Sequence, residues 1–462
     1  MNQAAATQPI PIDDLRGELT GSVIGPDDAG YDDARVVLYR EDARPAVIIR
    51  AETVADVVRA VDLARTGGLE LAVRSGGHSG VGHGTSDGGI VLDLSAMKAV
   101  DIDVAGGTVW AETGLTAGEL STAVGEHGLV IGFGDTGSVG IGGITVGGGV
   151  GFLARKYGLT IDNVLAANVV TADGTLVRTD ADHEPDLFWA IRGGGGNFGV
   201  VTRFQYRLHE LPSIVGGMLL LPATPEVIAG FMAAADAAPE ALSAIANVMQ
   251  VPPMPFVPTE QHGTLGLMAL MTWAGDTESG QRALAPFRAL ATPIADLLRP
   301  MTYAEMFPPE QPGPHIVGVN RTFFIDHVDV EMGRLMLSRI EEHVRTTDAL
   351  AAVAQLRVLG GAVARVPVDA TAYAHRNGRI MVNVAAVVPS LEATAAHTGW
   401  LDDFAAELDQ GDDGKYVNFV LDEGEAGVRQ AYPGATWNRL TALKRRYDPT
   451  NLFRLNQNIP PA

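Results

Sequence analysis

Glycine is denser in one stretch of this chain than a regular helix or strand tolerates. Between positions 134 and 151, nine of eighteen residues are glycine, with Val139, Ile141 and Val150 among the apolar residues between them. Each glycine inside a helix or strand costs about 0.5–1 kcal/mol. We therefore expect no ordinary core element here, and the interleaved apolar residues argue against a flexible linker. The run predicts backbone shaped around a ligand.

The excess of glycine lies before residue 200. Glycine accounts for 55 of 462 residues, about 12% against ~7% in average proteins. A second cluster, Val73-Arg74-Ser75-Gly76-Gly77-His78-Ser79 with Gly82-His83 just after it, lies between two short apolar runs. Successive N–H groups of such a loop form an anion-binding nest that suits phosphate oxygens. A tight turn with a surface histidine is the simpler explanation of this loop taken alone.

A third cluster has the G-x-G-x-x-G spacing of a dinucleotide fingerprint, at Gly194, Gly196 and Gly199. That fingerprint requires a strand before the glycines and a helix after them. Here a helical turn over 186–192 precedes the glycines, and a strand over 200–208 follows them. We therefore reject a Rossmann site.

Charge and composition exclude several classes of function. The 33 Lys and Arg against 55 Asp and Glu give a net charge of -22, which repels nucleic acid and anionic membranes. The absence of cysteine excludes disulfides, thiolate nucleophiles and cysteine-based metal centres, and we predict no metal site. No apolar run is long enough to cross a bilayer, and positions 1–9 resemble a loose leader rather than a signal peptide. We expect a soluble, cytoplasmic monomer or homodimer.

Apolar periodicity predicts an α+β fold. In the first half we expect strands at 45–49, 71–73, 89–94, 106–113, 129–133 and 200–208, and helices at 53–65, capped by Thr53, and at 117–127. In the second half we expect strands at 215–221, 265–273, 353–359, 380–387 and 416–420, and helices at 225–246, 282–298 and 330–344. The second set predicts an antiparallel sheet covered by helices. We divide the chain into a leader with first elements (1–39), a glycine-rich domain (40–211), a substrate domain (212–415) and a C-terminal segment that returns to the glycine-rich domain (416–462).

Several separated motifs occur in an order typical of one family. They are the Arg74–His78 loop, the glycine run over 140–151, Leu187-Phe188-Trp189-Ala190-Ile191-Arg192-Gly193-Gly194-Gly195, Tyr416-Val417-Asn418-Phe419 and Gln457-Asn458-Ile459-Pro460-Pro461. With these motifs the chain resembles the berberine-bridge-enzyme branch of the vanillyl-alcohol-oxidase flavoproteins. The resemblance covers about 30–210 and 355–462, and between 213 and 350 it is only architectural.

The resemblance implies a two-part PCMH-type FAD-binding domain followed by the substrate domain. It also implies a covalent bond from a ring nitrogen of His78 to the 8α-methyl carbon of the flavin. Relatives that attach FAD twice carry a cysteine where this chain has Thr136, so we expect a single attachment. The residues expected to bind FAD are Arg74, Ser75, Gly76, Gly77, Ser79, His83, Thr136, Gly137, Ser138, Gly140, Gly142, Gly143, Thr145, Gly148, Gly149, Gly151, Asn197, Gly199, Val200, Val201, Asn418, Asn456 and Asn458.

The resemblance also places the chemistry beside the strand at 353–359. Gln355 and Arg357 share one face of this strand, and Tyr416 matches the tyrosine base of plant alcohol oxidases in the branch. We predict that Tyr416 accepts the substrate proton, that the Arg357 cation lowers the pKa of Tyr416, and that Gln355 orients the substrate. In the alternative, Tyr416 only bonds within the core and Arg357 pairs with an acid such as Asp369.

Val139 aligns with a position at which, in this branch, valine lets oxygen approach the flavin. We therefore predict an oxidase that transfers a hydride from an alcohol or amine carbon to FAD and passes the electrons to O2, giving H2O2. The expected substrate is a small apolar or aromatic molecule of the secondary-metabolite kind. Two alternatives stay open: an FAD-linked dehydrogenase with another electron acceptor, and a non-catalytic flavin- or ligand-binding protein.

Overall fold

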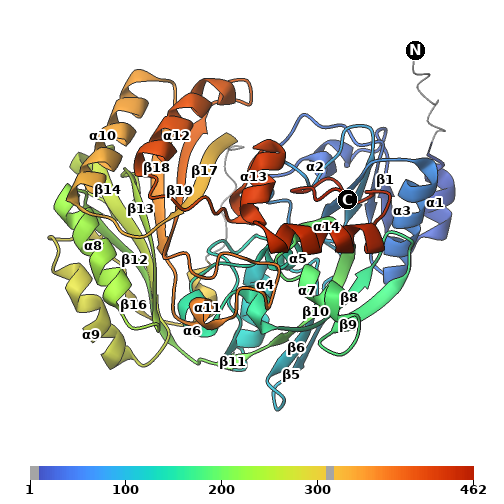
Figure 1. Cartoon of the computed structure of the whole chain (residues 1–462), viewed down its shortest axis with the longest axis horizontal. Helices are drawn as coiled ribbons and strands as arrows, with labels where there is room; N and C mark the ends of the chain where they lie inside the picture. Colours follow the sequence, from blue (N-terminus) through green and yellow to red (C-terminus); the bar gives the residue numbers. More distant parts are fainter. Residues whose placement is uncertain (1–9, 308–316, 462) are drawn as a thin grey trace.

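The computed structural model describes residues 10–307 and 317–461, so the expected leader at 1–9 lies outside the described residues. Two lobes lie side by side (Figure 1). One lobe is built on a large sheet with helices along its outer side, and the other holds a four-stranded and a five-stranded sheet and both ends of the described chain. Separate helices and largely antiparallel sheets confirm the predicted α+β class.

The first part of the chain forms a four-stranded sheet in the order β1-β2-β4-β3. Strands β2, β3 and β4 are parallel, and β1 pairs antiparallel with β2. The side chain of Thr53 caps helix α3 as predicted, in a capping box with Asp56. The elements are α1 (Ile12–Glu18), β1 (Ser22–Ile24), α2 (Tyr31–Arg35), β2 (Val47–Arg50), α3 (Val54–Gly67), β3 (Leu71–Arg74) and β4 (Ile90–Asp93). Because β3 is an edge strand that ends at Arg74, the loop after it lies at the border of this sheet.

The next part forms a five-stranded antiparallel sheet in the order β5-β6-β10-β8-β9. The predicted strand after Gly199 and the helical turn before it are both present, as β10 and α7. The elements are β5 (Val100–Asp103), β6 (Thr108–Glu112), α4 (Ala117–Gly125), β7 (Leu129–Val130), α5 (Ile141–Gly147), α6 (Ala154–Tyr157), η1 (Thr160–Asn163), β8 (Val164–Val170), β9 (Leu176–Asp180), α7 (Pro185–Ala190), η2 (Gly195–Asn197), β10 (Val200–Arg207) and β11 (His209–Glu210), which pairs with β7.

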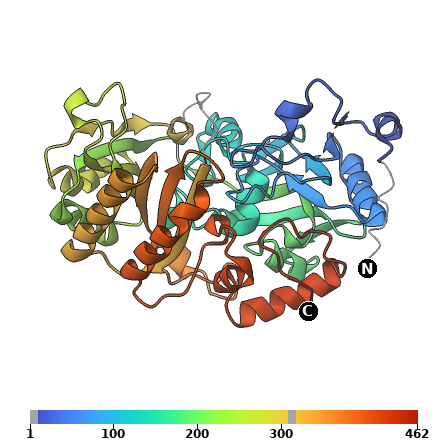
Figure 2. The same ribbon diagram turned by 90° about the horizontal axis from the view of Figure 1, so that it is seen from above.

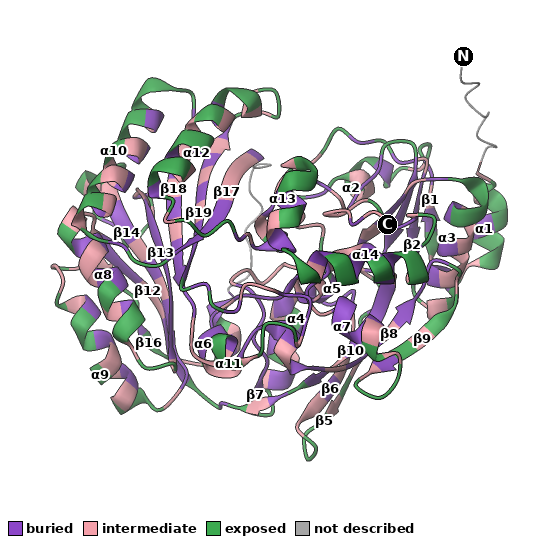
Figure 3. Ribbon diagram, in the orientation of Figure 1, coloured by how far each residue is buried: buried purple, intermediate pink, exposed green. Residues whose placement is uncertain are grey.

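The other lobe contains an eight-stranded antiparallel sheet, as predicted, in the order β15-β12-β14-β13-β18-β19-β17 with β16 beside β12. Its elements are β12 (Ile214–Pro222), α8 (Pro225–Ala237), β13 (Leu242–Gln250), η3 (Thr259–Gln261), β14 (Leu265–Trp273), α9 (Thr277–Arg288), β15 (Ala295–Asp296), β16 (Arg299–Met301), η4 (Tyr303–Met306), β17 (Val317–Ile325), α10 (Val330–Thr346), β18 (Ala351–Val358), α11 (Ala362–Arg365), β19 (Ile380–Val388) and α12 (Thr394–Leu408). Helices α8, α9, α10 and α12 cover one face, whose side chains form the largest apolar core. Figure 3 shows these helices exposed on the outside and the strands buried beneath them.

Two of the predicted helices are shorter than expected. The helix predicted over 225–246 ends at Ala237, and β13 begins at Leu242. Pro239 explains the break, because the residue before a proline is driven out of the α region, and Ala238 is extended. The helix predicted over 282–298 is α9, which begins at its Asp276 cap and ends at Arg288.

Two other expectations about local structure were wrong. The glycine run does contain a helix, α5, whose first residue Ile141 is buried. Burial on its apolar side offsets the poor helix propensity of its glycines. The strand predicted over 416–420 is instead the 3₁₀ turn η5 (Val417–Phe419). Tyr416 caps this turn, and the N–H of Phe419 donates to the Tyr416 carbonyl at 2.8 Å.

The C-terminal segment lies against the lobe with the two smaller sheets. Helices α13 (Gly424–Ala431) and α14 (Ala435–Tyr447) run along that lobe in both views (Figures 1 and 2). Lys444 and Asp448 form a fully buried ion pair at 2.7 Å. The Lys444 ammonium also donates to the carbonyls of Asn197 and Phe453. This pair fixes the end of the chain beside η2.

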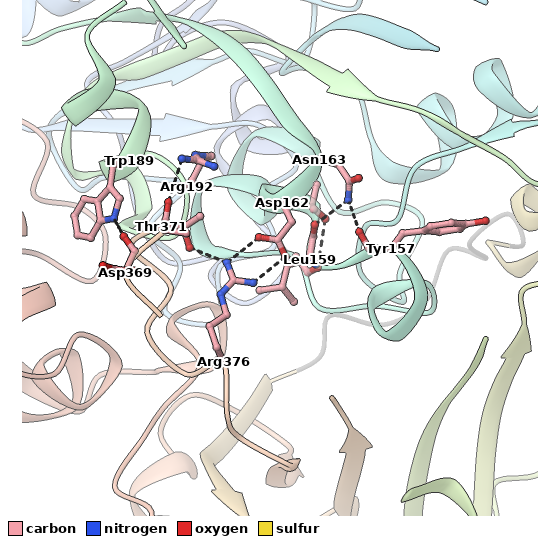
Figure 4. A network of polar contacts seen from close by, with 12 residues as sticks. Tyr157, Leu159, Asp162, Asn163, Trp189, Arg192, Asp369, Thr371 and Arg376 are labelled. Atoms are coloured by element: carbon pink, nitrogen blue, oxygen red, sulfur yellow. Dashed lines mark hydrogen bonds and ion pairs between the residues drawn. The ribbon is translucent and has the colours of Figure 1, made fainter. Parts of the chain in front are cut away.

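A buried polar network joins the segment before β19 to the same lobe (Figure 4). Arg376 donates two bonds to the Asp162 carboxylate, both at 2.8 Å, and one to Thr371. The indole of Trp189 donates to the Asp369 carbonyl, and Arg192 donates to the Ala370 carbonyl. The network fixes residues 369–376 against η1 and α7. The domain boundaries at 39, 211 and 415 stay predictions.

Candidate functional site

A cavity of about 350 Å³ lies where the two lobes meet. Its walls come from the loop after β3, the glycine run, the start of β10, strand β18 and the C-terminal segment. The predicted site residues that line it are Arg74, Ser75, Gly76, Gly77, His78, Ser79, His83, Thr136, Val139, Gly140, Gly142, Gly143, Gly199, Val200, Val201, Arg357, Tyr416, Asn418 and Asn456. Three motifs predicted from separate parts of the sequence therefore share one cavity.

The loop after β3 packs backbone against backbone on the glycine run. A Cβ at Gly76 would lie 2.2 Å from the Gly140 nitrogen, so no side chain fits there. Gly77 adopts a φ of 72°, in the left-handed region that favours glycine. Arg74 is buried and pairs with Asp93 at 3.0 Å, so its guanidinium stabilises the loop from behind. Although burial opposes it, the Arg74 charge holds the pKa of Asp93 below its ordinary value.

Two histidines of this loop border the cavity. The His78 Nε2 lies 2.7 Å from the Ser138 hydroxyl, which ties the loop to the glycine run. Burial lowers the pKa of His83 to about 4, so this imidazole is neutral at pH 7. Helix α5 approaches the same space, and a Cβ added at Gly143 would meet nothing within 4 Å. This edge of the cavity offers backbone surface.

The sheet side of the cavity carries the charged groups. Arg357 donates to the Asp135 carboxylate at 2.6 Å and to the Gln355 side-chain oxygen at 2.8 and 3.0 Å. It also donates to the Val150 carbonyl at 3.3 Å. The expected alternative partner, Asp369, lies elsewhere and uses its carbonyl to accept the Trp189 bond. Gln355 lies next to Arg357 on the same face but outside the cavity lining.

Tyr416 lies at the base of the cavity with its hydroxyl held from the protein side. Its oxygen accepts bonds from the Gly149 N–H and the Asn418 amide, both at 2.9 Å, and a longer one from the Val150 N–H at 3.4 Å. Burial raises the pKa of Tyr416, and these donors and the Arg357 charge only partly offset it. The expectation that Arg357 lowers this pKa below its ordinary value was therefore wrong, because the phenol is 2% exposed.

Several residues expected to bind the cofactor do not reach the cavity lining. They are Gly137, Ser138, Thr145, Gly148, Gly149, Gly151, Asn197 and Asn458. A Cβ at Gly151 would lie 1.9 Å from the Phe133 carbonyl, so this glycine serves packing within the protein. Thr145 bonds the buried Tyr206 hydroxyl, and Asn197 holds the carbonyls of Gly194 and Gln457. These residues stand outside the cavity lining, and their expected contact with the cofactor stays a prediction.

Asp135 was missed by the sequence analysis, although it pairs with Arg357 in the cavity wall. A signal was present, because it is the only charged residue in the glycine run over 134–151. Phe419 was also missed as a wall residue, and its ring faces the Arg357 guanidinium at 5.0 Å. No group of acidic or histidine side chains within residues 10–307 and 317–461 is arranged to hold a metal. In the same ranges, no helix is long and apolar enough to span a bilayer.

Comparison with known proteins agrees with this geometry. The chain matches an FAD-binding domain over residues 45–180 and a berberine and berberine-like segment over 415–460. It is 31% identical over 458 residues to (R)-6-hydroxynicotine oxidase of Paenarthrobacter nicotinovorans, covering 96% of this chain and 97% of that protein. The chain belongs to the berberine-bridge-enzyme-like family of FAD-linked oxidoreductases.

Further relatives extend the likeness to the whole fold. An FAD-linked oxidoreductase of Dictyostelium discoideum is 30% identical over 426 residues, covering 90% of this chain and 89% of that protein. A crystal structure of 6-hydroxy-D-nicotine oxidase from Arthrobacter nicotinovorans superposes with a TM-score of 0.84 at 28% identity, covering 96% and 98% of the two chains. Physcomitrella patens BBE-like 1 shares the fold at a TM-score of 0.83 and 23% identity, covering 98% and 100%. Because it belongs to this family, the protein is an FAD-binding oxidoreductase.

The described residues fit FAD. Asn456 lines the cavity, and its side-chain oxygen is buried without a hydrogen-bond partner among the described residues. A buried acceptor without a partner is costly, so a donor group of a ligand at this end of the cavity would satisfy it. The backbone N–H groups of the loop around Gly76 and Gly77 suit phosphate oxygens, and phosphate binding there stays a prediction. These loops would hold the cofactor, and the sheet wall would face its reactive ring.

Proposed function

We propose that this protein is an oxidase that converts an alcohol or amine to the corresponding carbonyl or imine and reduces O2 to H2O2, with FAD attached once, through His78. The observation that carries the attachment is the position of His78 in the cavity wall. Because Ser138 engages Nε2 at 2.7 Å, a bond through Nδ1 would leave that contact in place. Thr136 lines the same cavity and offers no thiol for a second bond.

When bound, FAD supplies the hydride acceptor and returns both electrons to O2. The residues of this chain accept the proton that the substrate loses. In an alcohol, the carbon loses a hydride while the hydroxyl loses a proton, which leaves a carbonyl. Tyr416, in its phenolate form, takes that proton and becomes a neutral phenol, because the residue lines the cavity and its oxygen is held in place by Gly149 and Asn418. The bonds to this oxygen are all accepted from the protein, so no described residue receives the O–H of the neutral phenol.

O2 as the electron acceptor is supported by Val139 and by the relative named as an oxidase. Val139 lines the cavity, half-buried, between Ser138 and Gly140. Its small side chain leaves space where a larger one would extend toward the ring-binding wall. The relative that is 31% identical is a nicotine oxidase by name. These two observations favour an oxidase over an FAD-linked dehydrogenase.

Colour and peroxide test the proposal. The purified protein is expected to be yellow, to keep its flavin after acid denaturation, and to release peroxide with members of an alcohol and amine panel. His78→Ala should release its flavin on denaturation, whereas His127→Ala, at an exposed position, should retain it. Flavin that leaves the wild-type protein in acid would overturn the covalent attachment. Substrate-dependent bleaching without peroxide in air would overturn O2 as the acceptor.

A further inference from the structure

Four carboxamide side chains lie in a row across the large sheet, on the face turned away from the helices. They are Asn320 on β17, Asn383 on β19, Gln355 on β18 and Asn247 on β13, four strands that neighbour one another. The alternating residues, such as Leu356 and Val382, are buried under the helices on the other face. These four residues are termed the amide row. Since Arg357 shares their face and lines the cavity, the amide row lies beside the cavity wall, although its four members are outside the cavity lining.

One end of the amide row has its orientation fixed by Arg357. The guanidinium donates to the Gln355 side-chain oxygen through Nε at 3.0 Å and Nη2 at 2.8 Å. Arginine has donors only, so the oxygen of Gln355 must face it, and both lone pairs of that oxygen are used. The Gln355 nitrogen donates one N–H to Asn247 at 2.9 Å. Its second N–H is left over.

The other end of the amide row is fixed by a backbone carbonyl. The Asn320 nitrogen donates to the Phe419 carbonyl at 2.9 Å, and a carbonyl oxygen only accepts. The same nitrogen donates to the Asn383 oxygen at 2.8 Å. Asn383 is therefore turned so that its NH2 group points away from Asn320. That NH2 group has no hydrogen-bond partner among the described residues.

The two fixed ends leave N–H donors at the centre of the amide row. Gln355 and Asn383 are directly opposite each other in the register of β18 and β19, which puts their Cβ atoms about 5 Å apart. Both side chains are half-exposed. The nearby charges of Arg357 and Asp135 form a pair and cancel as a unit. This part of the wall therefore offers donors without net charge.

We propose that Gln355 and Asn383 together bind a carbonyl oxygen of the substrate, so that the enzyme selects uncharged, carbonyl-bearing alcohols over substrates that carry a protonated amine. The inference rests on the proposed function, since it takes the substrate to lie between the cofactor and this wall. A carbonyl oxygen has two lone pairs and accepts from both side chains. A protonated amine has only donors, so it would meet N–H groups where it needs an acceptor.

Binding of two matched probes to the flavin-loaded protein tests the inference. The probes are 4-acetylbenzyl alcohol and 4-(aminomethyl)benzyl alcohol, which differ in the group para to the reacting carbon. Anaerobic calorimetry should show the acetyl compound binding at least about tenfold more tightly. In the double variant Gln355→Glu with Asn383→Asp, acceptors replace donors at the same shape, and the preference should reverse. Gln355→Glu keeps a partner in Arg357, so this change does not leave a buried charge unpaired.

A control is available on helix α9, which covers the outer face of the same sheet. Gln281 accepts from Arg288, which also pairs with Asp296, so this trio repeats the chemistry of Gln355, Arg357 and Asp135 far from the cavity. Gln281→Glu should leave both affinities unchanged. Tighter binding of the amine to the wild type, no binding of either probe, or an unchanged preference in the double variant would each overturn the inference. Peroxide from the same samples is scored separately, so an acetyl preference without peroxide would count against the oxidase proposal alone.

Discussion

Two arginines reach from neighbouring parts of the chain to carboxylates of the FAD-binding lobe, yet their surroundings differ. Arg376 is fully buried, with a two-bond contact to Asp162, whose side chain is 9% exposed (Figure 4). Arg357 makes a single-bond contact to Asp135, whose side chain is 22% exposed in the cavity wall. The first pair has no contact with the cavity lining, whereas the second forms part of it. The comparison indicates that one pair holds the lobes together and the other serves the site.

The largest expected effect is on stability, from breaking the buried pair. Arg376→Ala leaves the Asp162 carboxylate without its cation, which should lower the free energy of unfolding by about 3–5 kcal/mol. Urea titration followed by tryptophan fluorescence measures it. Arg365→Ala is the control, because its pair with Glu240 lies on the surface and should contribute little. Equal losses in the two variants would contradict a structural role for Arg376.

The next largest effect is expected from removing the proposed proton acceptor, Tyr416, which lies near the pair of Arg357 and Asp135. Tyr416→Phe keeps the buried ring and removes the hydroxyl, so the rate of anaerobic flavin reduction should fall by about 10²-fold. Stopped-flow absorbance at the flavin band measures the rate. Tyr432→Phe is a matched control, because its buried hydroxyl donates to the Gly193 carbonyl outside the cavity lining. A wild-type rate in Tyr416→Phe would refute the assignment.

How much of the fold and of the site could be predicted from the sequence depends on how far apart in the chain the interacting residues lie. The Arg74–His78 loop and the glycine run were predicted correctly as cavity walls, because glycine patterns report local backbone requirements. The pair of Arg357 with Asp135 joins positions far apart in the chain, and no local pattern reports such a contact. The pKa of Tyr416 was predicted in the wrong direction for the same reason. Its burial depends on β17, β19, η5 and the glycine run packing together.

The pH dependence of flavin reduction tests the same proton acceptor in another way. Burial raises the pKa of Tyr416 above its ordinary value of about 10. The basic form is therefore scarce at neutral pH, and the rate of flavin reduction should rise with pH, by up to about tenfold per unit, without levelling below pH 10. Rates between pH 7 and 10 measure it, with Tyr416→Phe as the control that should lack the slope. A plateau near pH 7 would identify another group as the proton acceptor.

The last prediction compares the two carboxylates, Asp162 and Asp135, directly. Its smallest expected effect is the change in the rate of flavin reduction caused by Asp135→Asn. Asp162→Asn leaves Arg376 buried beside a neutral amide, so this variant should unfold at clearly lower urea concentration than the wild type. Asp135→Asn removes a charge that water reaches, and Arg357 keeps its bonds to Gln355 and the Val150 carbonyl. The unfolding midpoint should therefore fall less than in Asp162→Asn, because Arg357, although its side chain is only 5% exposed, keeps these bonds. The rate of flavin reduction should nevertheless fall about threefold to tenfold, because an uncompensated guanidinium beside the cavity alters how substrate is held. If the two substitutions instead lowered stability alike and left the rate intact, Asp135 and Arg357 would be a second structural pair, and the distinction between the two arginines would not hold.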